Sequence, residues 1–450
     1  MRIVPILLAA GNGTRMKSNL PKMLHLLAGK PLVQHALDAV AGLGDETPVV
    51  VVGHGEDAVR QAVGDKVRIA VQEERLGTGH AVMAAEDLVK GQADMVVVTY
   101  ADMPLIKKET VQRLVEMQKN NSGPMTLMTV ELADPHGFGR IKRGQDGSVI
   151  AIVEEAVATP EELAIHELNA SIYCIQADWL WKALKQIKLS PKGEYYLTDL
   201  VEIAAAAGQK VQGIKTDDAT EAVGINNRVH LAEAETILRR RINENWMLGG
   251  VSIIDPANTY IEADVKIGQD TIIYPNTHIR GKTVIGEGCK IGPNAIIETC
   301  EIGKRVTILA SVMEKARMED DSEIGPFGHL RKGAHLGEHV HMGNFGEVKN
   351  SYLSAGTKMG HFSYIGDAQI GENVNIGAGT ITCNFDGVNK HKTVIAPNVF
   401  IGSDTMLVAP LFIGEGAHTG AGAVVTHDIL PGETVVGVPA HPLKKKENLD

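Results

Sequence analysis

The sequence has little of what a membrane span, a disulfide framework or a nucleic-acid surface would need. Its only cysteines, Cys174, Cys289, Cys300 and Cys383, show no CxxC pairing or ligand-like spacing, which indicates reduced thiols and no cysteine-based metal site. No apolar run reaches the roughly 18 residues of a membrane-spanning helix. The formal net charge of −11 disfavours nucleic acids and anionic membranes as partners, since both require clustered Lys and Arg. We therefore expect a soluble, cytoplasmic protein that acts on small molecules.

The first half of the chain alternates short β-branched runs with stretches of helical periodicity. Strands are expected over 3–9, 48–52, 67–71, 95–100 and 125–130, and helices over 32–43, 79–88 and 108–119. The first run is interrupted by Pro5 and continues into a glycine turn, so we interpret it as a strand rather than a signal peptide. We predict that residues 1–226 form an α/β, Rossmann-like domain. Its mainly parallel sheet should bind ligand at the carboxyl ends of its strands.

Residues 227–248 carry apolar side chains at helical spacing, among them Leu231, Leu238 and Ile242. We interpret this segment as a helix that connects two domains. An ordinary core helix of the first domain fits the periodicity equally well.

Residues 249–450 are repetitive, because an aliphatic residue followed by glycine returns mostly at intervals of six or a multiple of six. Such pairs begin at 267, 285, 291, 302, 324, 336, 342, 365, 370, 376, 401 and 413. A hexapeptide repeat is typical of a parallel β-helix, in which we expect the aliphatic residue to point inward and the glycine to permit a tight turn. We interpret the exceptional intervals as loops. The longest, 382–392, is where function is expected to concentrate.

The first predicted strand leads into a loop that suits phosphate. Gly11 and Gly13 would let backbone N–H groups approach phosphate oxygens, while Arg15 and Lys22 supply positive charge. The third glycine of a dinucleotide fingerprint is missing, because Met16 holds its place, and no Gly-Lys-Ser/Thr follows. The loop therefore disfavours a nicotinamide cofactor and excludes a Walker motif.

The run L-A-A-G-N-G-T-R-M over residues 8–16, with Pro21-Lys22 after it, resembles the pyrophosphorylase signature of sugar nucleotidyltransferases. With the hexapeptide tail, the order of motifs resembles the bifunctional N-acetylglucosamine-1-phosphate uridyltransferase/glucosamine-1-phosphate acetyltransferase family over nearly all 450 residues. The resemblance implies a left-handed β-helix and Mg²⁺, with UTP and acetyl-CoA as co-substrates. It also implies synthesis of UDP-N-acetylglucosamine, which normally feeds bacterial cell-envelope polymers such as peptidoglycan.

In the first domain, the resemblance implies a nucleotide site, a sugar site and a metal pair. The implied nucleotide contacts are Leu8, Ala9, Ala10, Gly11, Gln72, Leu76, Gly77, Thr78 and Tyr100, and the implied sugar contacts are Gly139, Glu154 and Asn169. Asp102 directly follows a predicted strand, where a carboxylate is well placed for Mg²⁺, although such a residue is often only a turn or cap. The resemblance pairs Asp102 with Asn226 as metal ligands and assigns Lys22 to the phosphates.

In the second domain, His361 follows a coil glycine. Acetyl transfer to a sugar amine needs a base with a pKa near neutrality, although a surface histidine is the simpler interpretation without a family resemblance. The resemblance makes His361 that base. Further implied contacts are Arg331, Lys349, Tyr364, Asn375 and Asn384 for the sugar phosphate, Glu347 to orient the histidine or the amine, and Ala378, Ser403 and Ala421 for acetyl-CoA.

Association of the chain into a homotrimer is expected, because one β-helix offers a flat face and three side by side create clefts. The acetyltransferase site should then be shared between subunits.

The sequence departs from the family pattern at several positions. Ala101 and Ser171 replace glycines, Phe385 replaces a tyrosine, and Glu155-Ala156-Val157 stands where Lys-Asp commonly follows the glutamate. The C-terminal Arg often used for the CoA phosphate is absent, and the Lys444-Lys445-Lys446 run is a candidate to replace it, although such runs are usually only solvated.

Three alternatives stay open at this point. One is a nucleotidyltransferase for dTTP or another sugar phosphate, with an acetyltransferase of different specificity. The second is a β-helix that serves only as an oligomerisation scaffold. The third is a binding protein without turnover, which the set of Gly11, Lys22 and Asp102 disfavours.

Overall fold

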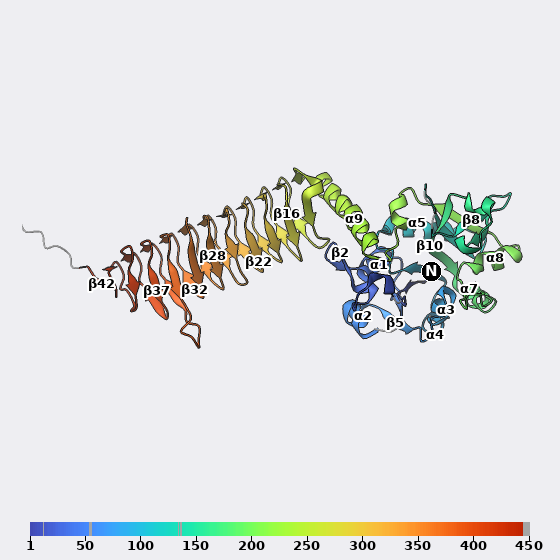
Figure 1. The fold of residues 1–450 in the computed structure, drawn as a ribbon, viewed down its shortest axis with the longest axis horizontal. Coiled ribbons are helices and arrows are strands. Elements are labelled where there is room, and N and C mark those ends of the chain that lie inside the picture. The colour runs from blue at the N-terminus through green and yellow to red at the C-terminus, as the bar shows by residue number, and fades with distance from the viewer. Residues whose placement is uncertain (12, 54–55, 134, 136, 444–450) are drawn as a thin grey trace, which may run out of the picture. The chain divides into compact units, whose positions relative to one another are not determined.

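The computed structural model describes residues 1–11, 13–53, 56–133, 135 and 137–443. The chain divides into two compact units, Met1–Leu238 and Arg239–Asp450 (Figure 1). Among the described residues, no helix is both long enough and apolar enough to cross a membrane.

The first unit is built on a mixed sheet with the strand order β11-β7-β10-β6-β1-β4-β5, beside which β8 and β9 pair. The strands of this unit are β1 Ile3–Leu8, β2 Leu26–Leu27, β3 Lys30–Pro31, β4 Val49–Val52, β5 Arg68–Val71, β6 Met95–Tyr100, β7 Met125–Glu131, β8 Arg140–Arg143, β9 Val149–Val153, β10 Glu167–Gln176 and β11 Val211–Lys215. Strand β10 runs antiparallel to β6 and β7, whereas β6, β1, β4 and β5 are parallel. The predicted α/β class is confirmed, and the parallel strands end at one edge.

The helices of this unit are α1 Leu32–Val40, α2 Glu56–Val63, α3 Thr78–Met83, α4 Glu86–Val89, α5 Lys108–Lys119, α6 Pro160–Leu163, α7 Ala177–Leu184 and α8 Asp199–Ala206. The helix predicted over 79–88 is two short helices, because the chain bends at Ala84 and Ala85. All six residues of β1 are buried. Burial on both faces explains why this strand reads as a continuous apolar run rather than an alternating one.

The second unit is a left-handed parallel β-helix with three faces. The first face holds β12 Ser252–Ile253, β15 Ile272–Ile273, β18 Lys290–Ile291, β21 Thr307–Ile308, β24 Glu323–Ile324, β27 His341–Met342, β30 Lys358–Met359, β33 Asn375–Ile376, β36 Phe400–Ile401, β39 His418–Thr419, β41 Thr434–Val436 and the antiparallel β42 His441–Pro442. The second face holds β13 Thr259–Ile261, β16 Thr277–Arg280, β19 Ile296–Glu298, β22 Val312–Glu314, β25 His329–Leu330, β28 Gly346–Lys349, β31 Ser363–Gly366, β34 Ile381–Cys383, β37 Met406–Val408 and β40 Val424–Val425. The third face holds β14 Lys266–Ile267, β17 Val284–Ile285, β20 Glu301–Ile302, β23 Arg317–Met318, β26 His335–Leu336, β29 Tyr352–Leu353, β32 Ala368–Ile370, β35 Thr393–Ile395 and β38 Leu411–Ile413.

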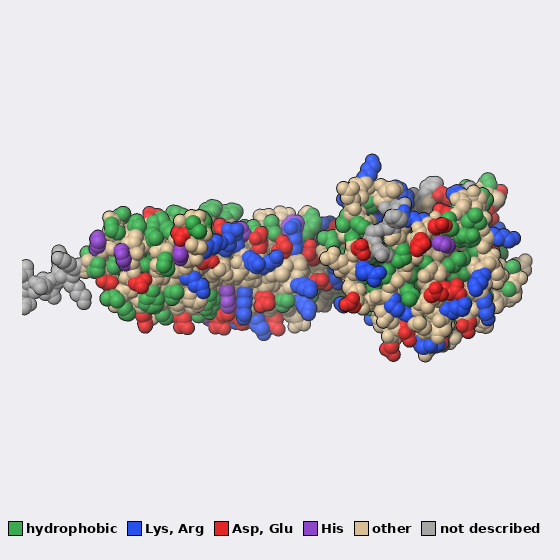
Figure 2. Space-filling model, turned by 90° about the horizontal axis from the view of Figure 1, so that it is seen from below, with side chains coloured by type: hydrophobic (Ala, Val, Ile, Leu, Met, Phe, Trp, Pro, Cys, Tyr) green, Lys and Arg blue, Asp and Glu red, His purple; other side chains and the backbone are tan. Residues whose placement is uncertain are grey.

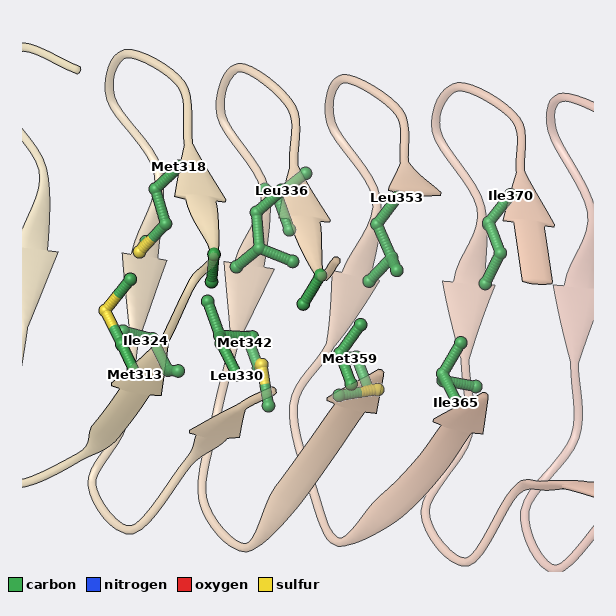
Figure 3. Close-up of a cluster of buried hydrophobic side chains, with 14 of the residues drawn as sticks. Met313, Met318, Ile324, Leu330, Leu336, Met342, Leu353, Met359, Ile365 and Ile370 are labelled. Atoms are coloured by element: carbon green, nitrogen blue, oxygen red, sulfur yellow. The ribbon is translucent and has the colours of Figure 1, made fainter. Parts of the chain in front are cut away.

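The aliphatic residue of each repeat points inward, as predicted. Leu336, Leu353 and Ile370 form one column and Met342 and Met359 belong to another, all fully buried (Figure 3). Each column places one apolar side chain per coil directly over the last, so the core is continuous along the β-helix.

The glycine after the aliphatic residue has a different role from the one predicted. At Gly268, a Cβ would lie 2.6 Å from the backbone nitrogen of Glu287 on the next coil. The tight turn is made instead by the residue two positions later, as at Asp270 (φ 61°) and Arg305 (φ 57°). Most of these glycines are therefore required by the close stacking of neighbouring coils rather than by their own backbone angles.

Most irregular intervals in the repeat are not loops, which corrects the interpretation above. Ile267 stacks on Ile285, 18 residues later, but Ile285 stacks on Ile302 after 17 and Ile302 on Met318 after 16. These coils are shorter by one or two residues at a corner. The segment between Cys383 and Thr393, in contrast, is an inserted loop, as expected.

Helix α9 Arg228–Leu248 contributes to both units. Leu231 and Leu238 pack in a core of the first unit, while Ile242 and Trp246 pack against the β-helix core. The amide of Asn243 donates to the carbonyl groups of Pro256 (2.9 Å) and Thr259 (3.1 Å). The two units divide inside this helix, and the three-segment division of the chain stays a prediction.

Replacing Gly343 with Ala should destabilise the β-helix, because its Cβ would overlap the carbonyl oxygen of Gly360 on the next coil. We expect a loss of about 1–3 kcal/mol in unfolding free energy, as for other overpacked sites. Gly360→Ala is the matched control, since its Cβ would meet only His341 Nε2 at 4.0 Å. Thermal and chemical unfolding followed by circular dichroism would measure both, and equal losses would contradict the stacking argument.

Candidate active sites

The phosphate loop of the first unit lies where parallel strands end. The N–H of Ala9 donates to Val51 O (2.8 Å) and that of Ala101 to Leu8 O (3.0 Å), which brings the ends of β1, β4 and β6 together. Gly13 has φ 59°, and a Cβ there would lie 2.6 Å from the Cβ of Lys22. Gly13 thus lets the loop fold against Lys22, whereas the space around Gly11 is open.

Two oxygen donors meet two cations at this edge. The ammonium of Lys22 donates to Asp102 Oδ2 at 2.5 Å and to Asn226 Oδ1 at 3.4 Å, and Arg15 Nη2 donates to Asn226 Oδ1 at 2.9 Å. The N–H of Ile225 bonds to Asp102 O (2.8 Å), so the segments carrying both oxygen donors are tied together. Lys22 is almost fully buried. Two cations thus meet one carboxylate and one neutral carboxamide at this edge of the sheet, which leaves an excess of positive charge.

The donor set fits Mg²⁺. A carboxylate and a carboxamide oxygen are hard ligands, and Mg²⁺ in enzymes commonly takes one or two protein oxygens, with water and substrate phosphates completing its shell. Among the described residues, no cluster of three His, Cys, Asp or Glu could hold a metal without such help. Asp102 and Asn226 are therefore suited to a metal that arrives with a phosphate ligand.

Half of the predicted first-unit residues share one cavity of about 530 Å³. Those that line it are Arg15, Thr78, Tyr100, Asp102, Gly139, Glu154, Asn169 and Asn226. The remaining ones, Leu8, Ala9, Ala10, Gly11, Lys22, Gln72, Leu76 and Gly77, do not line it; Leu8 to Gly11 run from the end of β1 into the phosphate loop, Lys22 contacts two lining residues, and Gln72 to Gly77 form the approach to α3.

The Gln72 side chain is buried and supports the loop before α3. Its amide donates to Gly77 O at 3.1 Å and lies 3.1 Å from His80 Nδ1. Gly77 has φ 95°, and a Cβ there would meet Tyr195 O at 2.6 Å. The hydroxyl of Thr78 accepts the N–H of Leu197 at 3.0 Å. The loop is thus rigidly braced against the segment that follows α7.

The sugar-binding residues inferred from the resemblance lie close to one another on the lining of the cavity. The N–H of Asn169 donates to Gly139 O at 2.9 Å, and a Cβ at Gly139 would lie 3.7 Å from Glu154 Oε1. Glu154 accepts from the hydroxyl of Thr198 at 3.3 Å. Burial raises the pKa of Glu154 above its ordinary value, despite that hydrogen bond.

Several residues that line the cavity were not indicated by any motif in the sequence. Phe138, Tyr173, Tyr196, Thr198 and His230 also line it. They come from separate elements and loops, so no local motif links them. Tyr173 follows Asn169 on β10 by four residues, and the register of β10 against β7 shifts between them.

In the second unit, the predicted base and the predicted acetyl-CoA residues form one row. His361, Ala378, Ser403 and Ala421 occupy the same corner, between the first and second faces, on successive coils. Backbone hydrogen bonds connect these coils from Gly379 N to Phe362 O (2.6 Å), from Asp404 N to Ala378 O (2.6 Å) and from Gly422 N to Ser403 O (2.8 Å). The exposed imidazole therefore stands at one end of a strip of small side chains.

A cluster of cations lies on the second face beside this row. Lys349 pairs with Gly366 across β28 and β31. The neighbouring charges of Lys390 and Arg331 lower the pKa of the Lys349 ammonium. Arg331 Nη1 donates to Glu347 Oε1 at 2.9 Å, so Glu347 holds the guanidinium in place. Because these cations repel one another, the binding of an anion beside them is favoured.

Lys390, which sequence reasoning missed, reaches the cluster from the inserted loop. Phe385 and Lys390 form an antiparallel bridge, and Asp386 accepts from the N–H groups of Val388 (2.8 Å) and Asn389 (2.7 Å). These bonds fold the insertion into a hairpin. In the sequence, only the asparagine-rich composition of the loop pointed to a functional role for this segment.

Tyr364, Asn384 and Asn375 occupy different places around the cluster. A Cβ at Gly366 would overlap the Tyr364 hydroxyl and lie 2.9 Å from Asn384 Nδ2, and Asn384 Nδ2 donates to Asp367 Oδ2 at 2.5 Å. Asn375 lies on the first face, between Lys358 and Phe400. Within this chain it is separated from the second-face residues by the corner row.

Comparison with known proteins agrees with both units. A model of the MobA-like NTP transferase domain matches residues 5–138. The bifunctional protein GlmU of Shouchella clausii is 44% identical over 425 residues, covering 94% of each chain. That of Heliobacterium modesticaldum is 46% identical over 444 residues, covering 98% of this chain and 96% of its own. That of Pelobacter propionicus is 44% identical over 439 residues, covering 96% and 95%. The chain belongs to the family of bifunctional GlmU proteins.

The departures from the GlmU pattern differ in their structural consequences. Ala101 is fully buried and its φ is not positive, so a methyl group is accommodated there. Ser171 has φ 58°, a conformation that costs a residue with a Cβ about 1–2 kcal/mol relative to glycine. Phe385 is 59% exposed on the hairpin. Asn12 and the Lys444-Lys445-Lys446 run lie outside the described residues.

Replacing Asp199 with Asn should stabilise the first unit at high pH. Burial, Glu202 and Glu154 raise the pKa of Asp199 to about 6. The unfolded chain loses this proton near pH 4, so the carboxyl weakens the fold progressively as pH rises from about 4 to 6. We expect a gain of about 1 kcal/mol at pH 8, discounted for partial exposure, and no gain below pH 4.

Chemical unfolding at pH 8 and pH 5, followed by tryptophan fluorescence, would measure this difference. Asp178→Asn, in the first turn of α7, is the control. If the gain in unfolding free energy of Asp199→Asn does not shrink toward low pH, the raised pKa of Asp199 is not its cause.

Proposed function

We propose that the chain makes UDP-N-acetylglucosamine in two steps. Acetyl-CoA acetylates glucosamine 1-phosphate at the second unit, and UTP then uridylylates N-acetylglucosamine 1-phosphate at the first unit with release of pyrophosphate. The observation that carries the proposal is that a chain of the GlmU family presents two separate sites. One is a cavity with paired cations and oxygen donors, and the other is an imidazole beside a cation cluster.

In the uridylyl transfer, a phosphate oxygen of the sugar attacks the α-phosphorus of UTP in line. A new P–O bond forms as the bond to the pyrophosphate oxygen breaks. Arg15 and Lys22 would face the phosphates, and Lys22 would exchange its contact with Asp102 for one with substrate. Asp102 and Asn226 would hold Mg²⁺, which when bound neutralises phosphate charge. Gly139, Glu154 and Asn169 would hold the sugar.

In the acetyl transfer, the sugar nitrogen attacks the thioester carbon. The proton leaves the nitrogen for the imidazole of His361, and the tetrahedral intermediate expels the CoA sulfur. Arg331, Lys349 and Lys390 would hold the sugar 1-phosphate, because their mutual repulsion is relieved by an anion. Ala378, Ser403 and Ala421 leave room for the pantetheine arm along the corner. The free thiol state of the cysteines and the use of these co-substrates support a cytoplasmic location.

A homotrimer is proposed on the basis of exposed apolar side chains beside the His361 row. Phe327, Phe345 and Phe362 occupy the same corner on successive coils and are 59%, 60% and 55% exposed. The rings of Phe327 and Phe345 stack with centroids 5.3 Å apart. Figure 2 shows apolar side chains gathered over the C-terminal half of the β-helix, and acidic and basic groups intermixed elsewhere on that face. Such a ridge suits contact with a second copy of the chain.

The function is tested with separate variants of the two sites. Incubation with glucosamine 1-phosphate, acetyl-CoA, UTP and Mg²⁺ should give UDP-N-acetylglucosamine by mass spectrometry, and dTTP should not replace UTP. His361→Ala should reduce acetyl transfer by at least about 100-fold, the scale of a lost general base, and spare pyrophosphate release.

Asp102→Asn, or chelation of Mg²⁺, should reduce pyrophosphate release and spare acetyl transfer. If His361→Ala leaves acetyl transfer intact, His361 is not the base. If the parent protein transfers no acetyl group, the β-helix is a scaffold and the two-reaction proposal fails.

The trimer is tested with Phe345→Asn, which keeps a residue that tolerates φ 57° and removes the ring. Sedimentation should show three chains for the parent protein and a lower mass for the variant, with weaker acetyl transfer and normal uridylyl transfer. His339→Asn, at a left-handed position of another corner (φ 57°), is the matched control and should stay trimeric. A parent protein that sediments as one chain would contradict the proposal.

A further inference from the structure

Ser171 is a strained residue inside the sugar cavity. It lies on β10 between Asn169 and Tyr173, where the register against β7 shifts, and it lines the cavity with φ 58°. Glycine would take this conformation without cost. A residue with a Cβ at a strained position in a binding cavity is a candidate for a role of its side chain.

The hydrogen bonds around Ser171 have a fixed direction. The N–H of Ser171 donates to Asn169 Oδ1 at 3.0 Å, which fixes the orientation of that carboxamide. Asn169 Nδ2 must therefore face Tyr173 and donate to its hydroxyl oxygen, 2.7 Å away. A carboxamide nitrogen can only donate, so the Tyr173 proton must go elsewhere.

The Ser171 side chain is an acceptor next to the Tyr173 hydroxyl. Tyr173 is fully buried. Burial raises the pKa of its hydroxyl well above the ordinary value, and hydrogen bonding with Asn169 and with the Ser171 side chain partly offsets that rise. If the phenol donates to Ser171 Oγ, the O–H of Ser171 is left to donate. Because Ser171 lines the cavity, that donor is available to a bound ligand.

We infer that Ser171 is a sugar-specificity residue of the uridylyl transfer, donating its hydroxyl to an acceptor oxygen of the sugar, and that Tyr173 is the positioning residue behind it. The inference rests on the proposed uridylyl transfer. The acceptor is either a ring hydroxyl or the carbonyl oxygen of the N-acetyl group, and substrates with and without that group distinguish the two.

The experiment compares Ser171→Gly and Ser171→Ala with the parent enzyme. We expect the KM for N-acetylglucosamine 1-phosphate to rise about tenfold in both, the scale of one lost hydrogen bond, with the KM for UTP unchanged. Ser171→Gly should also melt at a higher temperature, because its backbone strain is relieved. Glucose 1-phosphate lacks the N-acetyl group. Its KM should rise by the same factor in the variants if a ring hydroxyl is the acceptor, and should not change if the carbonyl oxygen is the acceptor.

Two further variants distinguish a role of Ser171 in sugar recognition from a role in stability alone. Tyr173→Phe should raise the KM for the sugar phosphate, and adding Ser171→Ala to it should have no further effect, because both act through one chain of hydrogen bonds. Ala28→Gly relieves a similar strain (φ 44°) outside the cavity and should raise the melting temperature without changing any KM.

The Kd of UDP-N-acetylglucosamine, measured by calorimetry, keeps this test independent of turnover. A tenfold weaker Kd in Ser171→Gly, with greater thermal stability, supports the inference. An unchanged KM and Kd in Ser171→Gly would overturn it and leave the proposed function standing, whereas a parent enzyme that binds the nucleotide sugar without any uridylyl transfer would overturn the proposed function instead.

Discussion

Hydrogen bonding between parallel neighbouring strands decides where the functional side chains of this protein lie. In the first unit, parallel pairing of β6, β1 and β4 brings Leu8 and Ala101 to one edge of the sheet. In the second unit, parallel pairing from coil to coil places His361, Ala378 and Ser403 in a row. Both sites are consequences of one rule, that strands running in the same direction end, and turn, at the same place.

Charge is arranged differently at the two sites. Lys22 is buried and already paired with Asp102, so phosphate binding there exchanges one ionic contact for another. Lys349, Lys390 and Arg331 instead repel one another at the exposed second site, so an anion would lower the energy of the cluster. The first arrangement is suited to a crowded triphosphate in a cavity, and the second to a monophosphate on an open face.

Much of the first site could be predicted from the sequence because its residues lie in local motifs. The first strand, the Gly11 and Gly13 loop that follows it, and Asp102 after a buried strand are all short-range patterns. Tyr173 and Lys390 could not be predicted in this way. Tyr173 lines a cavity whose other residues come from distant segments of the chain, and Lys390 reaches Lys349 through the fold of a hairpin.

The sequence by itself determined the α/β class, the β-helix and its inward aliphatic columns, because hydrophobic periodicity and a six-residue repeat are local properties of the chain. Only the tertiary structure decided why the glycines at the coil corners are needed, that irregular intervals are shorter coils, and that Glu347 bonds to Arg331. The reason is physical: a backbone clash, a register or an ion pair depends on residues from a neighbouring coil or strand, and sequence spacing alone does not fix how closely those neighbours approach.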